Sequence, residues 1–247
     1  AYVVGVFTVP VELRPNVFYA EPMNPLIADI QMPLWLALLV GGLLAALIAF
    51  LIGWPVLRLR GDYLAIATLG FSEIIRIVIT NAQSWTNGAL GIKDIPALND
   101  VRYIFIATAI TFLFVTCLIN SSYGRAFKAI REDEIAAEAM GVGLFKHKCM
   151  AFMISAFFAG IGGGLYATLL GTVDPKIFLF TLTYTFLLII VLGGMGSITG
   201  SMLGSIIVTA GLEYLRVFDE PLELFGMAIP LFRPGFRMVI FSVLLMA

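Results

Sequence analysis

The feature that most constrains the fold is an apolar stretch without a charged residue, Pro33–Pro55 (PLWLALLVGGLLAALIAFLIGWP). A helix of about 20 apolar residues spans the hydrocarbon core of a bilayer. Trp35 and Trp54 stand near the two ends of the stretch, as aromatic side chains do at membrane interfaces. Backbone polar groups in lipid need partners within their own segment, which favours a helix. The stretch therefore predicts a transmembrane helix.

Other apolar stretches divide the rest of the chain. They predict helices at Gly61–Asn81, Tyr103–Asn120, Cys149–Leu170, Leu182–Leu192, Ser201–Leu215 and from Phe236 onward. Only 13% of the 247 residues are charged, about half the share of a soluble domain. The composition predicts an all-α polytopic membrane protein in which residues 1–247 form one domain. Because residue 1 is Ala rather than Met and Met238–Ala247 stops within an apolar run, the chain is expected to lack both natural termini. Five prolines in Pro10–Pro33 predict an exposed loop with room for a short helix. The glycines in Gln83–Arg102 predict a polar loop of irregular backbone.

Charged residues gather in one block, Gly124–Lys148, which holds five of the fifteen Lys and Arg residues and four of the sixteen acids. Short loops rich in Lys and Arg stay in the cytoplasm. Through residue 181, seven such residues fall on the side of this block and four on the other side. The seven are Arg58, Arg60, Arg125, Lys128, Arg131, Lys146 and Lys148, and the four are Arg14, Lys93, Arg102 and Lys176. The block is therefore predicted to be cytoplasmic.

Within the block, strong helix formers after residue 134 predict a short helix. Acids in its first turn suit the helix dipole, and Gly141 and Gly143 suit its end. The acids are Glu132, Asp133 and Glu134. At about 100° per residue, one face collects Arg131, Glu134 and Glu138, and the other collects Ala136, Ala139 and Met140. The small apolar face suits insertion into a partner's groove; the alternative is a solvated loop helix without a partner.

Four motifs resemble, in this order, those of LivM-type branched-chain amino acid permeases, which are membrane subunits of ABC importers. RLRGDYLAIATLGFSEIIRIV (Arg58–Val78) resembles their second-span signature, and GALGIKDIP (Gly88–Pro96) a glycine-rich loop. AIREDEIAAEAMGVGLFKHK (129–148) resembles their cytoplasmic EAA loop, and VLGGMGSITGSMLGS (Val191–Ser205) a glycine-rich break. The resemblance covers Leu34–Leu215.

This resemblance implies an importer permease-type helical bundle with a cytoplasmic coupling helix, in the bacterial inner membrane, for leucine, isoleucine or valine. It implies as partners a LivH-like second permease, two ATPase subunits (LivG- and LivF-like) and a periplasmic amino-acid-binding protein. ATP and Mg would be used by the ATPases, and this chain would bind no cofactor; it has no G-x-x-x-x-G-K-[ST] motif. The implied ATPase-coupling residues are Arg131, Glu132, Asp133, Glu134, Ala136, Ala137, Glu138 and Gly141.

Two ionisable residues interrupt the second span. Glu73 and Arg76 are three residues apart, so they can pair on one helix face. Ionisable groups near mid-bilayer are costly and suggest function. They could line the path of a zwitterionic amino acid, with Thr68 and Ser72 beside them; alternatively the pair locks this span to a neighbour, and the hydroxyls bond their own helix.

Glycines in the later spans allow close helix packing. Gly160 and Gly164 form G-x-x-x-G. A second cluster, Gly193, Gly194, Gly196 and Gly200, predicts either tight packing or a helix break that bends during transport.

Three other functions compete with the amino acid importer. A urea or short-amide ABC permease would share its architecture. A gradient-driven transporter would use Glu73 as the ion or proton site. A membrane-embedded enzyme has no support, because one loop histidine, His147, and two separated cysteines, Cys117 and Cys149, provide no catalytic or metal-binding set.

Overall fold

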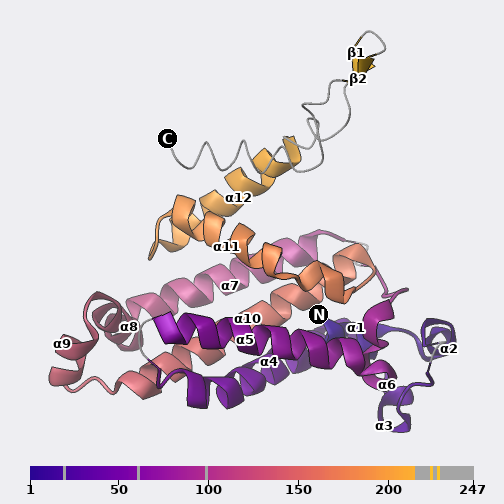
Figure 1. The fold of residues 1–247 in the computed structure, drawn as a ribbon, viewed down its shortest axis with the longest axis horizontal. Coiled ribbons are helices and arrows are strands. Elements are labelled where there is room, and N and C mark those ends of the chain that lie inside the picture. Colours follow the sequence, from indigo (N-terminus) through magenta and orange to yellow (C-terminus); the bar gives the residue numbers. More distant parts are fainter. Residues whose placement is uncertain (19–20, 60–61, 98–99, 215–222, 225–226, 229–247) are drawn as a thin grey trace. The chain divides into compact units, whose positions relative to one another are not determined.

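The computed structural model describes residues 1–18, 21–59, 62–97, 100–214, 223–224 and 227–228. These residues are mainly helical (Figure 1). The α-helices are α1 (Tyr2–Thr8), α2 (Arg14–Val17), α3 (Pro25–Ala28), α4 (Leu34–Val56), α5 (Asp62–Asn81), α6 (Gln83–Thr86), α7 (Arg102–Asn120), α8 (Ser122–Glu132), α9 (Glu134–Ala139), α10 (Leu144–Leu170), α11 (Phe180–Gly193) and α12 (Ile198–Tyr214). The 3-10 helices are η1 (Val11–Leu13), η2 (Gly88–Leu90) and η3 (Pro175–Phe178), and two short antiparallel strands are β1 (Glu223–Leu224) and β2 (Met227–Ala228).

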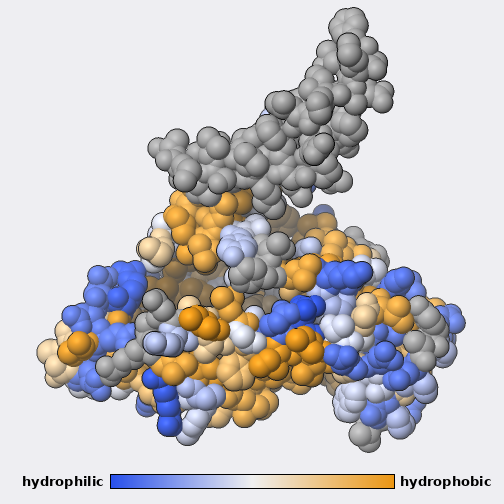
Figure 2. Space-filling model, viewed as in Figure 1, coloured by the Kyte–Doolittle hydropathy of each residue, from blue (hydrophilic) through white to orange (hydrophobic). Residues whose placement is uncertain are grey.

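The chain divides into two units, Ala1–Leu179 and Phe180–Ala247. Among the described residues, four helices are long and apolar enough to cross a membrane: α4, α5, α7 and α10. All four belong to the first unit. Figure 2 shows hydrophobic residues over the middle of this unit and hydrophilic residues at its two ends. The first four predicted spans are thus confirmed, and the multi-pass membrane class with them.

The fourth span begins five residues before its predicted start. α10 starts at Leu144 rather than Cys149, with Gly143 as its N-cap. The prediction was wrong because it followed hydropathy alone. Lys146, His147 and Lys148 are compatible with a helix, so the helix continues beyond the apolar stretch and carries these polar residues outside the hydrocarbon.

α10 packs closely against α4, and glycines make that approach possible. A methyl group on Gly160 would lie 2.9 Å from the Cβ of Ala45 and 3.0 Å from the carbonyl oxygen of Gly41. One on Gly164 would lie 2.6 Å from a methyl of Leu38. Small residues that let backbones approach are typical of helix pairs in membranes. The predicted tight packing at Gly160 and Gly164 is confirmed.

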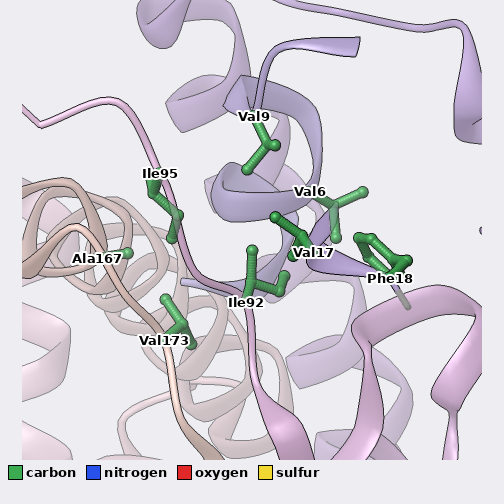
Figure 3. Close-up of a cluster of buried hydrophobic side chains, with 8 residues drawn as sticks. All are labelled: Val6, Val9, Val17, Phe18, Ile92, Ile95, Ala167 and Val173. Carbon is green, nitrogen blue, oxygen red and sulfur yellow. The ribbon is translucent and has the colours of Figure 1, made fainter. Parts of the chain in front are cut away.

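The end of the first unit opposite α8 and α9 is closed by a cluster of buried apolar side chains (Figure 3). Its members come from the N-terminal segment, the loop after α5 and the end of α10. They are Val6, Val9, Val17, Phe18, Ile92, Ile95, Ala167 and Val173. The backbones of Ile92 and Val173 exchange two hydrogen bonds of 2.8 Å, an isolated antiparallel bridge. The loop Gln83–Arg102 is irregular as predicted, with Asn87 left-handed and buried.

The described part of residues 10–33 contains the short helices η1, α2 and α3 and surrounds a buried cation. Arg14 is only 4% exposed. Its guanidinium donates hydrogen bonds to the carbonyl oxygens of Val9 (3.2 Å), Ile27 (2.9 Å), Ala28 and Ile30 (2.7 Å). Burial lowers the pKa of Arg14, and the nearby Asp29 carboxylate opposes that effect. A charge buried this deeply needs such partners, and the four carbonyls hold the segment together.

In the second unit, α11 and α12 form a helical hairpin. Gly194 and Gly196 have φ angles of +85° and +90°, which side chains rarely adopt. A methyl group on Gly200 would lie 1.8 Å from the carbonyl oxygen of Gly193. The glycines thus place a tight turn between two helices at the predicted break; its bending during transport stays a prediction. The predicted helix from Phe236 onward lies outside the described residues.

The α4–α10 contact gives a first prediction. Gly160→Leu should strongly lower the yield of folded protein, because its side chain would meet Gly41 and Ala45 backbone and Cβ atoms. Gly162→Leu is the matched control, since a side chain there meets nothing within 4 Å. The measurement is the monodisperse fraction on size-exclusion chromatography and the midpoint of thermal unfolding in detergent. Equal stability of the two variants would contradict the packing.

Candidate coupling helix and membrane cavity

α9 is a six-residue helix that is capped at both ends. The carboxylate of Asp133 accepts hydrogen bonds from the N–H groups of Ile135 (2.8 Å) and Ala136 (3.0 Å), as an N-cap residue does. At the other end Gly141, with φ +83°, donates to Glu138, and Val142 donates to Ala137. These two bonds make a Schellman motif. Because so short a helix is unstable alone, the caps explain why it forms.

The capping geometry corrects two details of the predicted helix. Asp133 is extended, with φ −154° and ψ 116°, so the chain leaves one helix there and enters another. Arg131 and Glu132 are the last residues of α8, and their side chains form an ion pair with each other. Arg131 therefore does not share a helix face with Glu134 and Glu138, and Glu132 is not in the first turn of α9. The sequence prediction placed Glu132, Asp133 and Glu134 together in the first turn of one helix, because acidic residues suit that position.

The two faces of α9 meet different surroundings. Ala137 is 4% exposed and faces the rest of the protein. Beside it, the carboxylate of Glu134 lies 2.6 Å from the Nζ of Lys148, on the first turns of α10. Ile135 and Met140 are 76% and 84% exposed. With Ala136 and Ala139, which are also exposed, they form an uncovered apolar face. We call these four residues the α9 apolar face.

The helix α8 connects α9 to the membrane span α7. The Ser121 hydroxyl caps α8 by accepting from the Gly124 N–H at 3.3 Å. Figure 1 shows α8 and α9 together at one end of the first unit, beyond the ends of the long helices. His147 lies near the rings of Tyr123 and Phe127, and one ring nitrogen lies 2.8 Å from the carbonyl oxygen of Gly143. The charged block thus folds as α8, α9 and the start of α10, which are joined at Asp133 and at residues 140–143.

Glu73 and Arg76 form the ion pair that their spacing predicts. The Arg76 Nε donates to both carboxylate oxygens of Glu73 at 3.0 Å. A second guanidinium nitrogen contacts the same carboxylate. Glu73 is 51% and Arg76 31% exposed, and no residue in the apolar window of α5 is buried. At about 1.5 Å per residue, Glu73 lies roughly 17 Å along α5, so the pair is near mid-bilayer on an uncovered face.

A cavity of about 390 Å³ adjoins this pair. Ser72 and Arg76 contribute its polar wall with Tyr2, whose buried hydroxyl has no hydrogen-bond partner among the described residues. The remaining walls are mostly aliphatic, from α1, α4, α5, α10 and η3. Thr68 and Glu73 are not among the lining residues. The hydroxyls of Thr68 and Ser72 donate to carbonyl oxygens of α5 itself, Ala65 (2.9 Å) and Leu69 (2.7 Å).

Sequence reasoning missed three residues of these sites. Ile135 is the second large exposed residue on the α9 apolar face, beside Met140. Its position about 100° from Ala136 around the helix is the signal that could have placed it on this face. Lys148 anchors α9, but no local pattern predicts a bridge from a residue fourteen positions away. Tyr2 reaches the cavity through tertiary packing of α1, for which the sequence gives no signal.

The chain is similar to known transport proteins. The family model described as branched-chain amino acid transport system / permease component matches residues 1–247. The chain belongs to this family. The high-affinity branched-chain amino acid transport system permease protein LivM of Escherichia coli is 39% identical over 220 residues, covering 75% of this chain and 52% of that relative. The chain thus spans about half the length of LivM.

Two less similar relatives have other names. The guanosine ABC transporter permease protein NupQ of Bacillus subtilis is 29% identical over 154 residues, covering 54% of this chain and 48% of that protein. The E. coli permease protein LivH is 28% identical over 201 residues, covering 70% of this chain and 63% of that protein. No solved structure matches.

The cap of α9 gives a second prediction. Asp133→Ala removes the acceptor of two first-turn N–H groups, and loss of an N-cap costs about 1 kcal/mol. We therefore expect amide exchange in α9 to become about fivefold faster. Hydrogen exchange measured by mass spectrometry on the membrane-embedded protein tests this. Asp133→Asn keeps an acceptor and should exchange slowly; equal protection in both variants would contradict the capping role.

Proposed function

We propose that this chain is the permease subunit of an ATP-driven importer for branched-chain amino acids in a bacterial inner membrane. The family and the names of its LivM relatives support the substrate class. In this proposal the chain catalyses no reaction. Two cytoplasmic ATPase subunits use ATP and Mg, and a periplasmic binding protein delivers the amino acid. A LivH-like second permease completes the membrane part, a pairing that the LivH relatives support.

The observation that carries the proposal is the α9 apolar face. This helix fixes Glu134 to Lys148 and exposes the large apolar side chains of Ile135 and Met140, with Glu138 as the exposed charge between its two faces. An amphipathic helix that presents its apolar side to solvent suits a groove on a partner. The seven cations on the same side as α9 support a cytoplasmic location, where an ATPase would dock.

The ion pair on α5 supports a second part of the proposal. Charged side chains near mid-bilayer face protein or water rather than lipid, so the uncovered face around Glu73 and Arg76 needs a protein or aqueous neighbour. We infer that this face lines the translocation path with Ser72 and the adjoining cavity, beside the second permease. The aliphatic walls suit a branched side chain, and Arg76 supplies positive charge for a carboxylate.

The alternatives differ in observable ways. Two relatives are named as guanosine and nucleoside ABC transporter permeases, so substrate class is tested with the cognate binding protein. A gradient-driven transporter would move substrate without ATP. Arg76 occupies both oxygens of Glu73, which favours an ion pair over a free proton site.

The α9 apolar face gives a third prediction. Ile135→Asp with Met140→Asp should release the ATPase subunits and lower ATP-dependent uptake at least tenfold, because a charged face cannot enter an apolar groove. Co-purification from native membranes and uptake into proteoliposomes measure the two effects. Leu13→Asp is the control, an exposed leucine at the opposite end of the first unit. Normal uptake in the double variant would rule out this face as the docking site.

The ion pair gives a fourth prediction. Arg76→Leu leaves the Glu73 charge without its partner, and uptake should fall more than tenfold. Replacing both residues with Leu removes the unpaired charge and should restore assembly, since an ion pair held out of water can be exchanged for apolar residues. If Arg76 lines the path, uptake stays low in the assembled double variant. Wild-type uptake in that variant would show that the pair is structural only.

A further inference from the structure

A second cavity lies between the end of α4 and the start of α10, at the α8–α9 end of the first unit. Its volume is about 630 Å³. Arg58, Lys146 and Lys148 line it, together with the carboxylates of Glu134 and Glu138. Lys148 is already paired with Glu134. Arg58 and Lys146 form no ion pair among the described residues, so they can receive an anion from outside the chain.

Arg58 is held in place by aromatic rings rather than by a carboxylate. Its guanidinium carbon lies 5.5 Å from the ring centroids of both Trp54 and Phe145. The two rings themselves meet edge to face at 5.7 Å. A cation over aromatic faces is fixed in position yet keeps its hydrogen-bond donors available. Arg58 therefore presents its donors to the cavity at little ordering cost.

An uncovered apolar ridge leads along α4 to this cation. At spacings of three and four residues, which place side chains on one helix face, it comprises Leu39, Leu43, Leu47, Leu51 and Trp54, each about half exposed or more. Arg58 follows four residues after Trp54, beyond the helix end. Because α4 is long and apolar enough to cross a membrane, the ridge would face the hydrocarbon and the cation at its end would stand at the boundary.

We propose that an anionic phospholipid binds here, with its phosphate between Arg58 and Lys146 and an acyl chain along the leucine ridge of α4. Basic pockets between membrane helices on the cytoplasmic side suit such headgroups. The apolar ridge distinguishes a phospholipid from other possible sources of the anion. A free phosphate ion or an acidic side chain of a soluble partner would use the cations but not a 20 Å apolar track (about 1.5 Å per residue over Leu39–Trp54).

The site is tested on the intact transporter, with the full-length chain and its partner subunits. Phosphatidylglycerol and phosphatidylcholine are titrated in detergent, and retained lipids are counted by native mass spectrometry. We expect preferential retention of phosphatidylglycerol. Arg58→Gln with Lys146→Gln should weaken the tightest site about tenfold. Lys93→Gln with Lys176→Gln removes the same charge at the opposite end and should change nothing; Arg58→Lys with Lys146→Arg should largely restore binding.

Several results would overturn the proposal. One is equal phosphatidylglycerol retention in the two double glutamine variants. Another is displacement of the lipid by millimolar inorganic phosphate, which would mean that the cations select a soluble anion. A third is loss of the ATPase subunits from the Arg58 and Lys146 variant with lipid retention unchanged, which would assign the cavity to that interface. Should the double variant not assemble, Lys146→Gln alone must still weaken retention, because Lys146 is exposed and has no described partner.

Discussion

The close crossing of α4 and α10 is the contact on which the rest of the first unit depends. Gly42, Gly160 and Gly164 remove the side chains that would hold the two backbones apart. In lipid there is no hydrophobic gain from bringing apolar helices together, so association relies on packing at short range. α1 joins the same crossing, because Val4 fills the space beside Gly41 and Gly164. The remaining spans have few buried residues of their own.

α10 gains a further role from this crossing, since it connects both ends of the unit. At its start, Lys148 bonds to α9, and at its end, Ala167 lies in the apolar cluster with Ile92 and Val173. A helix of 27 residues is about 40 Å long and resists compression along its axis. α10 is therefore the element that connects α9 to the apolar cluster at the opposite end of the unit.

The sequence predicted features that depend on local composition and failed where long-range placement decides. Spans followed from the length of apolar stretches, and the Glu73–Arg76 pair followed from a spacing of three residues. The break at Asp133 was missed because an acid suits a first turn as well as an N-cap. The order around Arg14 was missed because its carbonyl partners come from residues 9 to 30, which no periodicity relates. Which side of α5 contacts the rest of the protein, and which side stays open, also depends on packing alone.

Three arginines show how differently this chain accommodates charge. Arg14 is buried and donates four hydrogen bonds to carbonyl oxygens, so its role is structural. Arg76 is bound to a carboxylate on its own helix, and a zwitterionic solute could compete for both members of that pair. Arg58 alone is positioned by aromatic rings, which attract its charge without using its N–H groups. Because hydrogen-bond capacity that is not used internally is available to a ligand, Arg58, which forms no ion pair among the described residues, can accept an external anion without first breaking one.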